Sequence, residues 1–237
     1  MASHRLSLVA TNLAALLLLG VVDGAAQTSE PPAVDMDDLI QECQQTVRGK
    51  NHTGMVWWVP VEFWEATDPA SREHFDPLRE YTTIVVAVGR VGAFGINWSS
   101  EEAIRANIVL RDADGAEYRP LPNDKVSPEV QAMPSMMKAF FAQALGQMGE
   151  SMQVLFFPAR TRKGGPLADA RSRGTFAVVI NELAGDAQQT YSWKLPLTSL
   201  SPPRHCPVGK ERVKADWEYC PWHGVRLNEP EGGARPQ

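Results

Sequence analysis

The pattern of residues 107–121 predicts two short β-strands joined by a tight turn. In the first strand Ile108 and Leu110 alternate with their neighbours, as side chains on one face of a strand do. Asp114-Gly115 follows, and these residue types tolerate the positive φ of a two-residue hairpin turn. Upstream, residues 81–90 are the most β-branched run of the chain, so we predict that they form a central strand around which the others pack.

Further strands are predicted at fairly regular spacing, over residues 55–66, 151–159, 174–181 and 190–197. A short helix is predicted over residues 35–47 and a longer one over residues 134–148, because apolar residues recur there at intervals of three and four. The methionines of the longer helix favour a face that docks on the sheet, although thioether sulfur also suits copper(I). Six or seven strands with a helical insertion near residues 128–150 predict a mainly β fold, an antiparallel sandwich.

Part of this pattern is similar to a known type of module. The order N-x-x-L-x-D-x-x-G-x-x-Y-x-P is followed much later by an aromatic-aromatic-Pro strand end, at Asn107, Leu110, Asp112, Gly115, Tyr118, Pro120 and Phe156-Phe157-Pro158. It resembles the immunoglobulin-like modules of bacterial secreted proteins and lipoproteins. The resemblance covers about residues 80–181 and implies an immunoglobulin-like sandwich, and it carries no catalytic residue.

The first 26 residues predict export. An apolar run over residues 6–22 and the small residues Gly24-Ala25-Ala26 are typical of a signal peptide, cleaved here after Ala26. An uncleaved membrane anchor is the alternative. No second apolar stretch of about 18 residues follows, so we expect a periplasmic or extracellular protein with no membrane span after cleavage. The formal net charge of −5 gives no basic excess, so nucleic acid is not an expected partner.

Two groups of residues are candidates for a binding surface. Trp57 and Trp58 are adjacent in a predicted strand and must point to opposite faces, so one is expected in the core and the other at least partly exposed, unless a loop or helix covers it. Arg160, Arg162 and Lys163 lie in the one locally basic segment, residues 160–173. This segment either grips an anionic partner or is a solvated loop between strands.

The three cysteines fall into two classes. Cys43 lies on the apolar face of a predicted helix, so we expect a buried, inert thiol. Near the C-terminus, Cys206-Pro and Cys220-Pro turns resemble the paired knuckles of a zinc ribbon, C-P-x-C-G, but Gly209 and His223 stand at the second ligand positions. Because an oxidising compartment favours pairing, we predict a Cys206–Cys220 disulfide. The alternatives are zinc held by Cys206, Cys220 and His223 with His205 adjoining, and free thiols.

These observations divide the chain into a signal peptide (1–26), a sandwich domain (27–203), a Cys/His hairpin (204–227) and a disordered tail (228–237). No catalytic motif is present, so no catalytic residue is assigned. We predict a non-catalytic exported binding or assembly module with no cofactor, whose partner is a protein or a cell-envelope component. The first alternative is a metal-binding protein that uses Cys206, Cys220 and His223. The second is a hydrolase that acts outside the cytoplasm and rests on scattered acids and histidines. An acidic run could hold its carboxylate pair: Glu62, Glu65, Asp68, Glu73 and Asp76.

Overall fold

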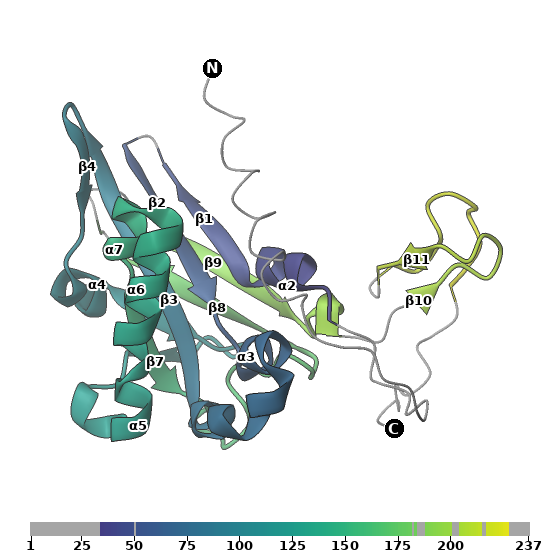
Figure 1. Ribbon diagram of the computed structural model, residues 1–237, viewed down its shortest axis with the longest axis horizontal. Helices are drawn as coiled ribbons and strands as arrows, with labels where there is room; N and C mark the ends of the chain where they lie inside the picture. Colours follow the sequence, from purple (N-terminus) through teal and green to yellow (C-terminus); the bar gives the residue numbers. More distant parts are fainter. Residues whose placement is uncertain are drawn as a thin grey trace, which may run out of the picture. The chain divides into compact units, whose positions relative to one another are not determined.

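The computed structural model describes residues 34–49, 51–181, 183, 188–200, 204–214 and 217–227 (Figure 1). The predicted signal peptide and the predicted tail lie outside these residues. Within the described part of the chain, no helix is both long and apolar enough to cross a membrane. Antiparallel strands dominate two larger sheets, and helices pack around them.

The five-stranded sheet is built around β3, as the run of β-branched residues predicts. One edge of β3 pairs with β2, and β7 and β4 share its other edge, β7 over residues 81–86 and β4 over residues 89–92. Its central residues, from Thr82 to Gly89, are buried, which explains why this segment is apolar on both faces. The strands are β1 (Gln44–Arg48), β2 (His52–Trp58), β3 (Tyr81–Gly92), β4 (Gly95–Trp98) and β7 (Gln153–Pro158).

The second sheet contains the hairpin that the sequence predicts over residues 107–121. Its order is β6 (Glu117–Tyr118), β5 (Ile108–Arg111), β8 (Gly174–Ile180) and β9 (Gln189–Leu195). The turn is organised by Asp112, whose Oδ1 accepts hydrogen bonds from the backbone N–H groups of Asp114 and Ala116. The hydroxyl of Tyr118 donates to Oδ2 at 2.8 Å, so the carboxylate ties both strands to the turn.

The described part of the chain contains more helix than the two segments predicted over residues 35–47 and 134–148. The α-helices are α2 (Met36–Cys43), α3 (Val61–Thr67), α4 (Glu101–Asn107), α5 (Pro128–Gln131), α6 (Met133–Leu145) and α7 (Gln147–Glu150). The 3-10 segments are η2 (Pro69–Glu80), η3 (Asn123–Lys125) and η5 (Thr198–Leu200). Helix α6 corresponds to the predicted insertion, and Met137 and Phe141 are buried on its inner face, so the prediction that it docks on the sheet is confirmed.

The adjacent residues Trp57 and Trp58 mark the two faces of the five-stranded sheet. Trp57 packs against Phe141 of α6, with ring centroids 5.6 Å apart. Trp58 packs against Phe176 of β8 in the second sheet, at 4.9 Å. The side chains therefore point to opposite faces as predicted, but neither is a surface residue, since Trp57 is 8% and Trp58 1% exposed. The proposal of either tryptophan as a binding surface was wrong, because α6 covers the face that the sequence left open (Figure 1).

Two predicted elements end earlier than their sequence patterns suggest. The helix expected over residues 35–47 stops at Cys43, where the chain enters β1. The strand expected over residues 55–66 stops at Trp58, and Pro60 then precedes helix α3. Proline fits just before or in the first turn of a helix because its missing N–H has no partner to lose there. Phe63 and Trp64 are therefore helical residues.

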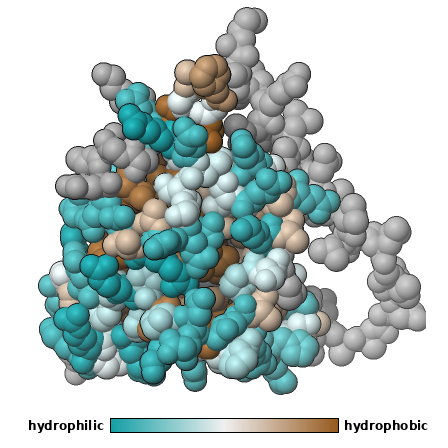
Figure 2. Space-filling model, turned by 90° about the vertical axis from the view of Figure 1, so that its left-hand side faces the viewer, coloured by the Kyte–Doolittle hydropathy of each residue, from teal (hydrophilic) through white to brown (hydrophobic). Residues whose placement is uncertain are grey.

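The β3–β4 hairpin carries hydrophobic side chains at its end. Phe94 is fully exposed and Val91 is about half exposed. Figure 2 shows hydrophobic residues at the top of a face that is otherwise mainly hydrophilic, where this hairpin ends. These side chains contribute nothing to the core.

Candidate metal centre

The first Cys-Pro turn links the two strands of the small C-terminal hairpin, β10 (Arg204–His205) and β11 (Arg212–Val213). The backbone N–H of Lys210 donates to the carbonyl of Cys206 at 2.9 Å. The N–H of Cys206 in turn donates to the carbonyl of Glu211 at 2.9 Å. Lys210 has a φ of 64°, the left-handed conformation that closes such a turn.

The second Cys-Pro turn repeats this backbone fourteen residues later. The N–H of Gly224 donates to the carbonyl of Cys220, and the N–H of Cys220 donates to the carbonyl of Val225, both at 2.8 Å. Gly224 has a φ of 63° and occupies the same turn position as Lys210. The two turns therefore have the same hydrogen-bond pattern and the same left-handed position, although their sequences differ.

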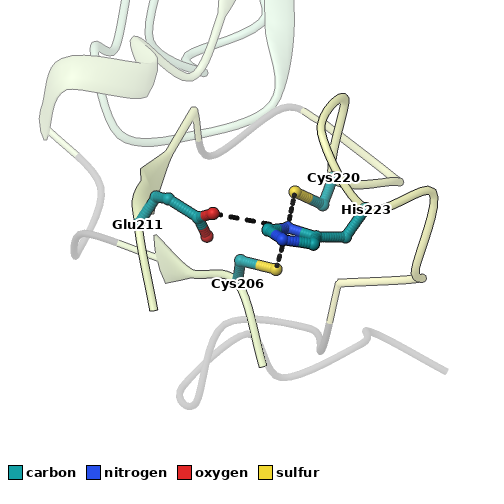
Figure 3. Close-up of side chains that lie close together, drawn as sticks. All are labelled: Cys206, Glu211, Cys220 and His223. Carbon is teal, nitrogen blue, oxygen red and sulfur yellow. Dashed lines mark hydrogen bonds and ion pairs between the residues drawn. The ribbon is translucent and has the colours of Figure 1, made fainter. Parts of the chain in front are cut away.

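Four side chains of these turns converge on one point (Figure 3). The Nδ1 atom of His223 lies 3.5 Å from the sulfur of Cys206 and 3.5 Å from the sulfur of Cys220. The same nitrogen lies 3.3 Å from Oε1 of Glu211. The four donor atoms all lie within 4.8 Å of one another. Both cysteines are buried in a hydrophobic cluster of this segment, which also contains Val213 and Leu227.

The distances match those between the ligands of a tetrahedral zinc ion. Zinc binds thiolate sulfur at about 2.3 Å, and imidazole nitrogen and carboxylate oxygen at about 2.0–2.1 Å. At a tetrahedral angle these lengths place sulfur and nitrogen about 3.5 Å apart, and nitrogen and oxygen about 3.3 Å apart. The cluster has these separations at both cysteines and at Glu211. Its donor set, two sulfurs, one nitrogen and one oxygen, is also one that zinc accepts.

Hydrogen bonding alone does not account for the cluster. A neutral imidazole carries one N–H, so Nδ1 of His223 cannot donate hydrogen bonds to both cysteine sulfurs and to Glu211 at once. The second oxygen of Glu211, Oε2, is buried and has no hydrogen-bond partner within the described segments. A cation among the four side chains would accept lone pairs from the two sulfurs, the nitrogen and the carboxylate oxygen together.

The site's electrostatics favour the metal-binding form of Cys220. Burial of the sulfur acts to raise the pKa of this thiol, but hydrogen bonds from the His223 side chain and from the backbone N–H groups of His223 and Trp222 outweigh it, so the pKa is lowered. The hydrogen bond to Cys220 and the charge of Glu211 raise the pKa of His223. A thiolate is the form of cysteine that binds metal.

The structure brings together three of the residues proposed from the sequence and replaces the fourth. Cys206, Cys220 and His223 converge as the zinc alternative requires. His205 is exposed and takes no part in the cluster, because successive residues of a strand point to opposite sides and Cys206 points inward. Glu211, which the sequence reasoning missed, supplies the fourth donor.

The predicted Cys206–Cys220 disulfide is not formed in the structure. All three cysteines are free and buried, and the two sulfurs of the hairpin each face His223. Cys43 has the burial expected of an inert thiol, and its pKa is raised by that burial and by the nearby charges of Glu42 and Glu62.

The basic segment proposed as a binding surface makes local contacts. The guanidinium of Arg160 donates to the carbonyl of Gly164, and that of Arg162 donates to the carbonyl of Glu117 and lies over the ring of Tyr118. Lys163 forms an ion pair with Asp114 at 2.8 Å. All three basic side chains are exposed, and the contacts of Arg162 and Lys163 hold the loop against the β5–β6 turn.

Among the described residues, Glu62 and Glu65 of the acidic run pair with arginines rather than with a histidine. Glu65 is buried and forms ion pairs with Arg79 and Arg72. Glu62 faces Arg171 at 3.7 Å beside a cavity of about 210 Å³, and its pKa is raised chiefly by burial. No histidine lines that cavity. Among the described residues, the cluster at Cys206 is the one group of three or more cysteine, histidine and acidic side chains with metal-ligand spacing.

Comparison with known proteins finds no matching family model, no similar curated protein and no similar solved structure.

Proposed function

We propose that the chain is a metal-binding protein in which residues 204–227 hold one zinc ion through Cys206, Glu211, Cys220 and His223. The observation that carries this proposal is the agreement of the three distances around His223 Nδ1 with a tetrahedral zinc site. The role we assign to the ion is structural. Four protein ligands complete its coordination, whereas catalytic zinc keeps one position for water or substrate.

The composition of the hairpin supports a structural ion. Among its described residues, the buried cluster contains four, of which two are the cysteines. So small a core supplies little hydrophobic stabilisation, and modules of this size commonly depend on a metal or disulfides. Zinc binding would then provide much of the free energy that folds residues 204–227.

The test is to purify the chain under reducing conditions and measure bound metal by mass spectrometry. We expect one equivalent of zinc. After replacement with cobalt(II), we expect the intense d–d absorption of a tetrahedral ion and the charge-transfer band of two thiolates. Cys206→Ser, Cys220→Ser and His223→Ala should each lose both the metal and these bands.

Cys43→Ser is the matched control, since it removes the third cysteine, which lies outside the cluster. This variant should keep its zinc. A wild-type chain purified in parallel without reductant that contains no zinc and has a mass two hydrogens lower, with Cys206 and Cys220 linked in the peptide map, would overturn the metal proposal and restore the disulfide.

A second candidate function concerns the body of the protein. We infer an exported, non-catalytic binding or assembly module of immunoglobulin-like type, supported by its two antiparallel sheets and by the exposed Phe94 at the end of the β3–β4 hairpin. Export is tested by intact mass: secreted material should begin at Gln27, and retention of residues 1–26 would contradict it. Loss of partner capture in Phe94→Ser would support the binding role.

A further inference from the structure

We infer that the C-terminal hairpin is an interaction surface for an acidic polypeptide segment that also carries apolar side chains. This inference rests on the proposed zinc site, because the ion would hold together the two turns that form the surface. Each turn presents an apolar side chain two residues after its cysteine, Val208 in the first and Trp222 in the second. These side chains are 59% and 61% exposed.

Exposed hydrophobic side chains are concentrated in residues 204–227. The described residues include five large hydrophobic side chains that are exposed, and three of them, Val208, Tyr219 and Trp222, belong to residues 204–227. The side chain of Trp222 is held in place by Trp217, since the two rings pack edge to face with centroids 5.9 Å apart. Exposed aromatic residues held by their neighbours are typical anchors of protein interfaces.

The charge of the segment identifies the partner's chemistry. Residues 204–227 contain five lysines and arginines and three acidic residues, whereas the remainder of the chain contains 18 basic and 25 acidic residues. One of the three acids, Glu211, faces the metal site, and Glu218 pairs with Arg226 at 3.6 Å. Lys210 and Lys214 are exposed beside the turns, and the exposed Arg212 forms an ion pair with Asp35 at 3.5 Å. A basic hairpin on an acidic chain is complementary to an acidic partner.

Nucleic acid fits this surface less well than a polypeptide. A nucleic-acid site needs a strongly basic face, and the excess here is two charges on a chain of net charge −5. The acidic remainder of the chain would repel a dense line of phosphates. Acidic side chains spaced along a polypeptide, with apolar residues between them, match both the lysines and the exposed aromatic rings.

The experiment uses the full chain loaded with zinc and a fluorescent copolymer of glutamate and tyrosine, with binding measured by anisotropy at two salt concentrations. We expect saturable binding that weakens at higher salt. The double variant Val208→Ser/Trp222→Ala should bind the copolymer about tenfold more weakly or worse, as truncation of interface anchors does. Val91→Ser is the matched control, because it removes an exposed hydrophobic side chain outside residues 204–227. It should bind normally.

Bound zinc is measured on the same samples, which separates this inference from the proposed function. If the chain holds zinc but the copolymer binds no better than a lysine–tyrosine copolymer, the surface inference is wrong and the metal site stands. If Val208→Ser/Trp222→Ala keeps its zinc and binds like wild type, these side chains are not the anchors and the inference fails. Tighter, Trp222-dependent binding of a single-stranded oligonucleotide would replace the polypeptide with nucleic acid as the partner. Absence of zinc would contradict the proposed function whatever the copolymer does.

Discussion

The carboxylate of Glu211 occupies the space in which a side chain at Gly209 would begin. A Cβ atom built on Gly209 would collide with Oε1, Oε2 and Cδ of Glu211. In the second turn the equivalent position is His223, which supplies its own donor to the cluster. The first turn therefore supplies its donor to the cluster from another position. Because Gly209 has no side chain, there is room for the carboxylate of Glu211, two residues later.

Gly209→Ala should weaken zinc binding without disturbing the backbone. The φ of Gly209 lies outside the left-handed region, so alanine is tolerated there, but its methyl group would displace the Glu211 carboxylate. We expect the zinc affinity to fall about ten- to hundredfold, the scale of losing one supporting or ligating group. The measurement is competition with a chromophoric chelator.

Glu211→Ala provides the comparison for this variant. Because both changes remove the same carboxylate from the site, the double variant should lose little more affinity than either single variant. Additive losses would show that Gly209 acts in another way.

Lys210→Gly should stabilise the zinc-bound hairpin. A non-glycine residue in the left-handed region costs roughly 1 kcal/mol, and Lys210 occupies it with a φ of 64°. Since the second turn already has glycine at this position, Gly224→Ala should have the opposite effect and destabilise by about 1 kcal/mol. A Cβ atom at Gly224 would touch nothing within 4 Å, so the backbone alone would be responsible. Metal-release midpoints in a chelator titration would report both shifts, and equal midpoints would contradict the argument.

Cys43 should resist alkylation in the folded protein. Its sulfur is fully buried, and burial raises its pKa well above the usual range of a thiol, so little thiolate forms. After zinc is chelated, we expect iodoacetamide to modify Cys206 and Cys220 first and Cys43 more than about a hundredfold more slowly. Peptide mapping over time gives the three rates. Rapid labelling of Cys43 before the body unfolds would mean that the α2–β1 junction opens locally.

Asp112→Asn should lower the melting temperature at neutral pH by roughly 2–4 °C, the shift expected for about 1 kcal/mol in a chain of this size. Burial acts to raise the pKa of Asp112, but hydrogen bonds from Tyr118, Ala116 and Asp114 outweigh it and lower the pKa. A carboxylate with a lowered pKa contributes stability that is fully present above its unfolded pKa of about 3.9 and is lost as the pH falls through its folded pKa.

The difference between wild type and Asp112→Asn should therefore shrink as the pH is lowered below about 4. Asp114→Asn is the control, since Asp114 belongs to the same turn as Asp112 and pairs with the exposed Lys163 of the neighbouring loop. A difference for Asp112→Asn that is constant from pH 7 to pH 3 would contradict the role of the carboxylate charge.

Local patterns explain which parts of the fold the sequence predicts. The buried run of β3 and the Asp112 turn depend on neighbouring residues, so both are visible in the chain. Proline occurs both in edge strands and at helix starts, so Pro60 by itself does not end the strand predicted over residues 55–66. The packing of Phe63 on Trp57 at 5.2 Å favours the helix. The covering of Trp57 by α6 depends on residues more than eighty positions away, which no local pattern reveals.

The sequence predicts only part of the metal site, because one of its ligands is not at a position that local spacing identifies. Counting from the cysteines identifies His223, because the second turn keeps the ligand spacing of a zinc ribbon. Glu211 is at no ribbon position and reaches the cluster only because Gly209 lacks a side chain. A glycine at a ligand position followed two residues later by an acid is the sequence signal that points to Glu211.

The placement of Trp57 and Trp58 on opposite faces also restricts the register in which β2 can pair with β3. A slip of one residue along β3 would turn Trp58 toward α6 and Trp57 toward the second sheet, so the helix and the second sheet would lose their aromatic contacts together. The docking of α6 and the stacking of the two sheets are thereby coupled through a single dipeptide. Difference fluorescence of Trp57→Phe and Trp58→Phe would follow each interface separately during unfolding, and the two traces should coincide.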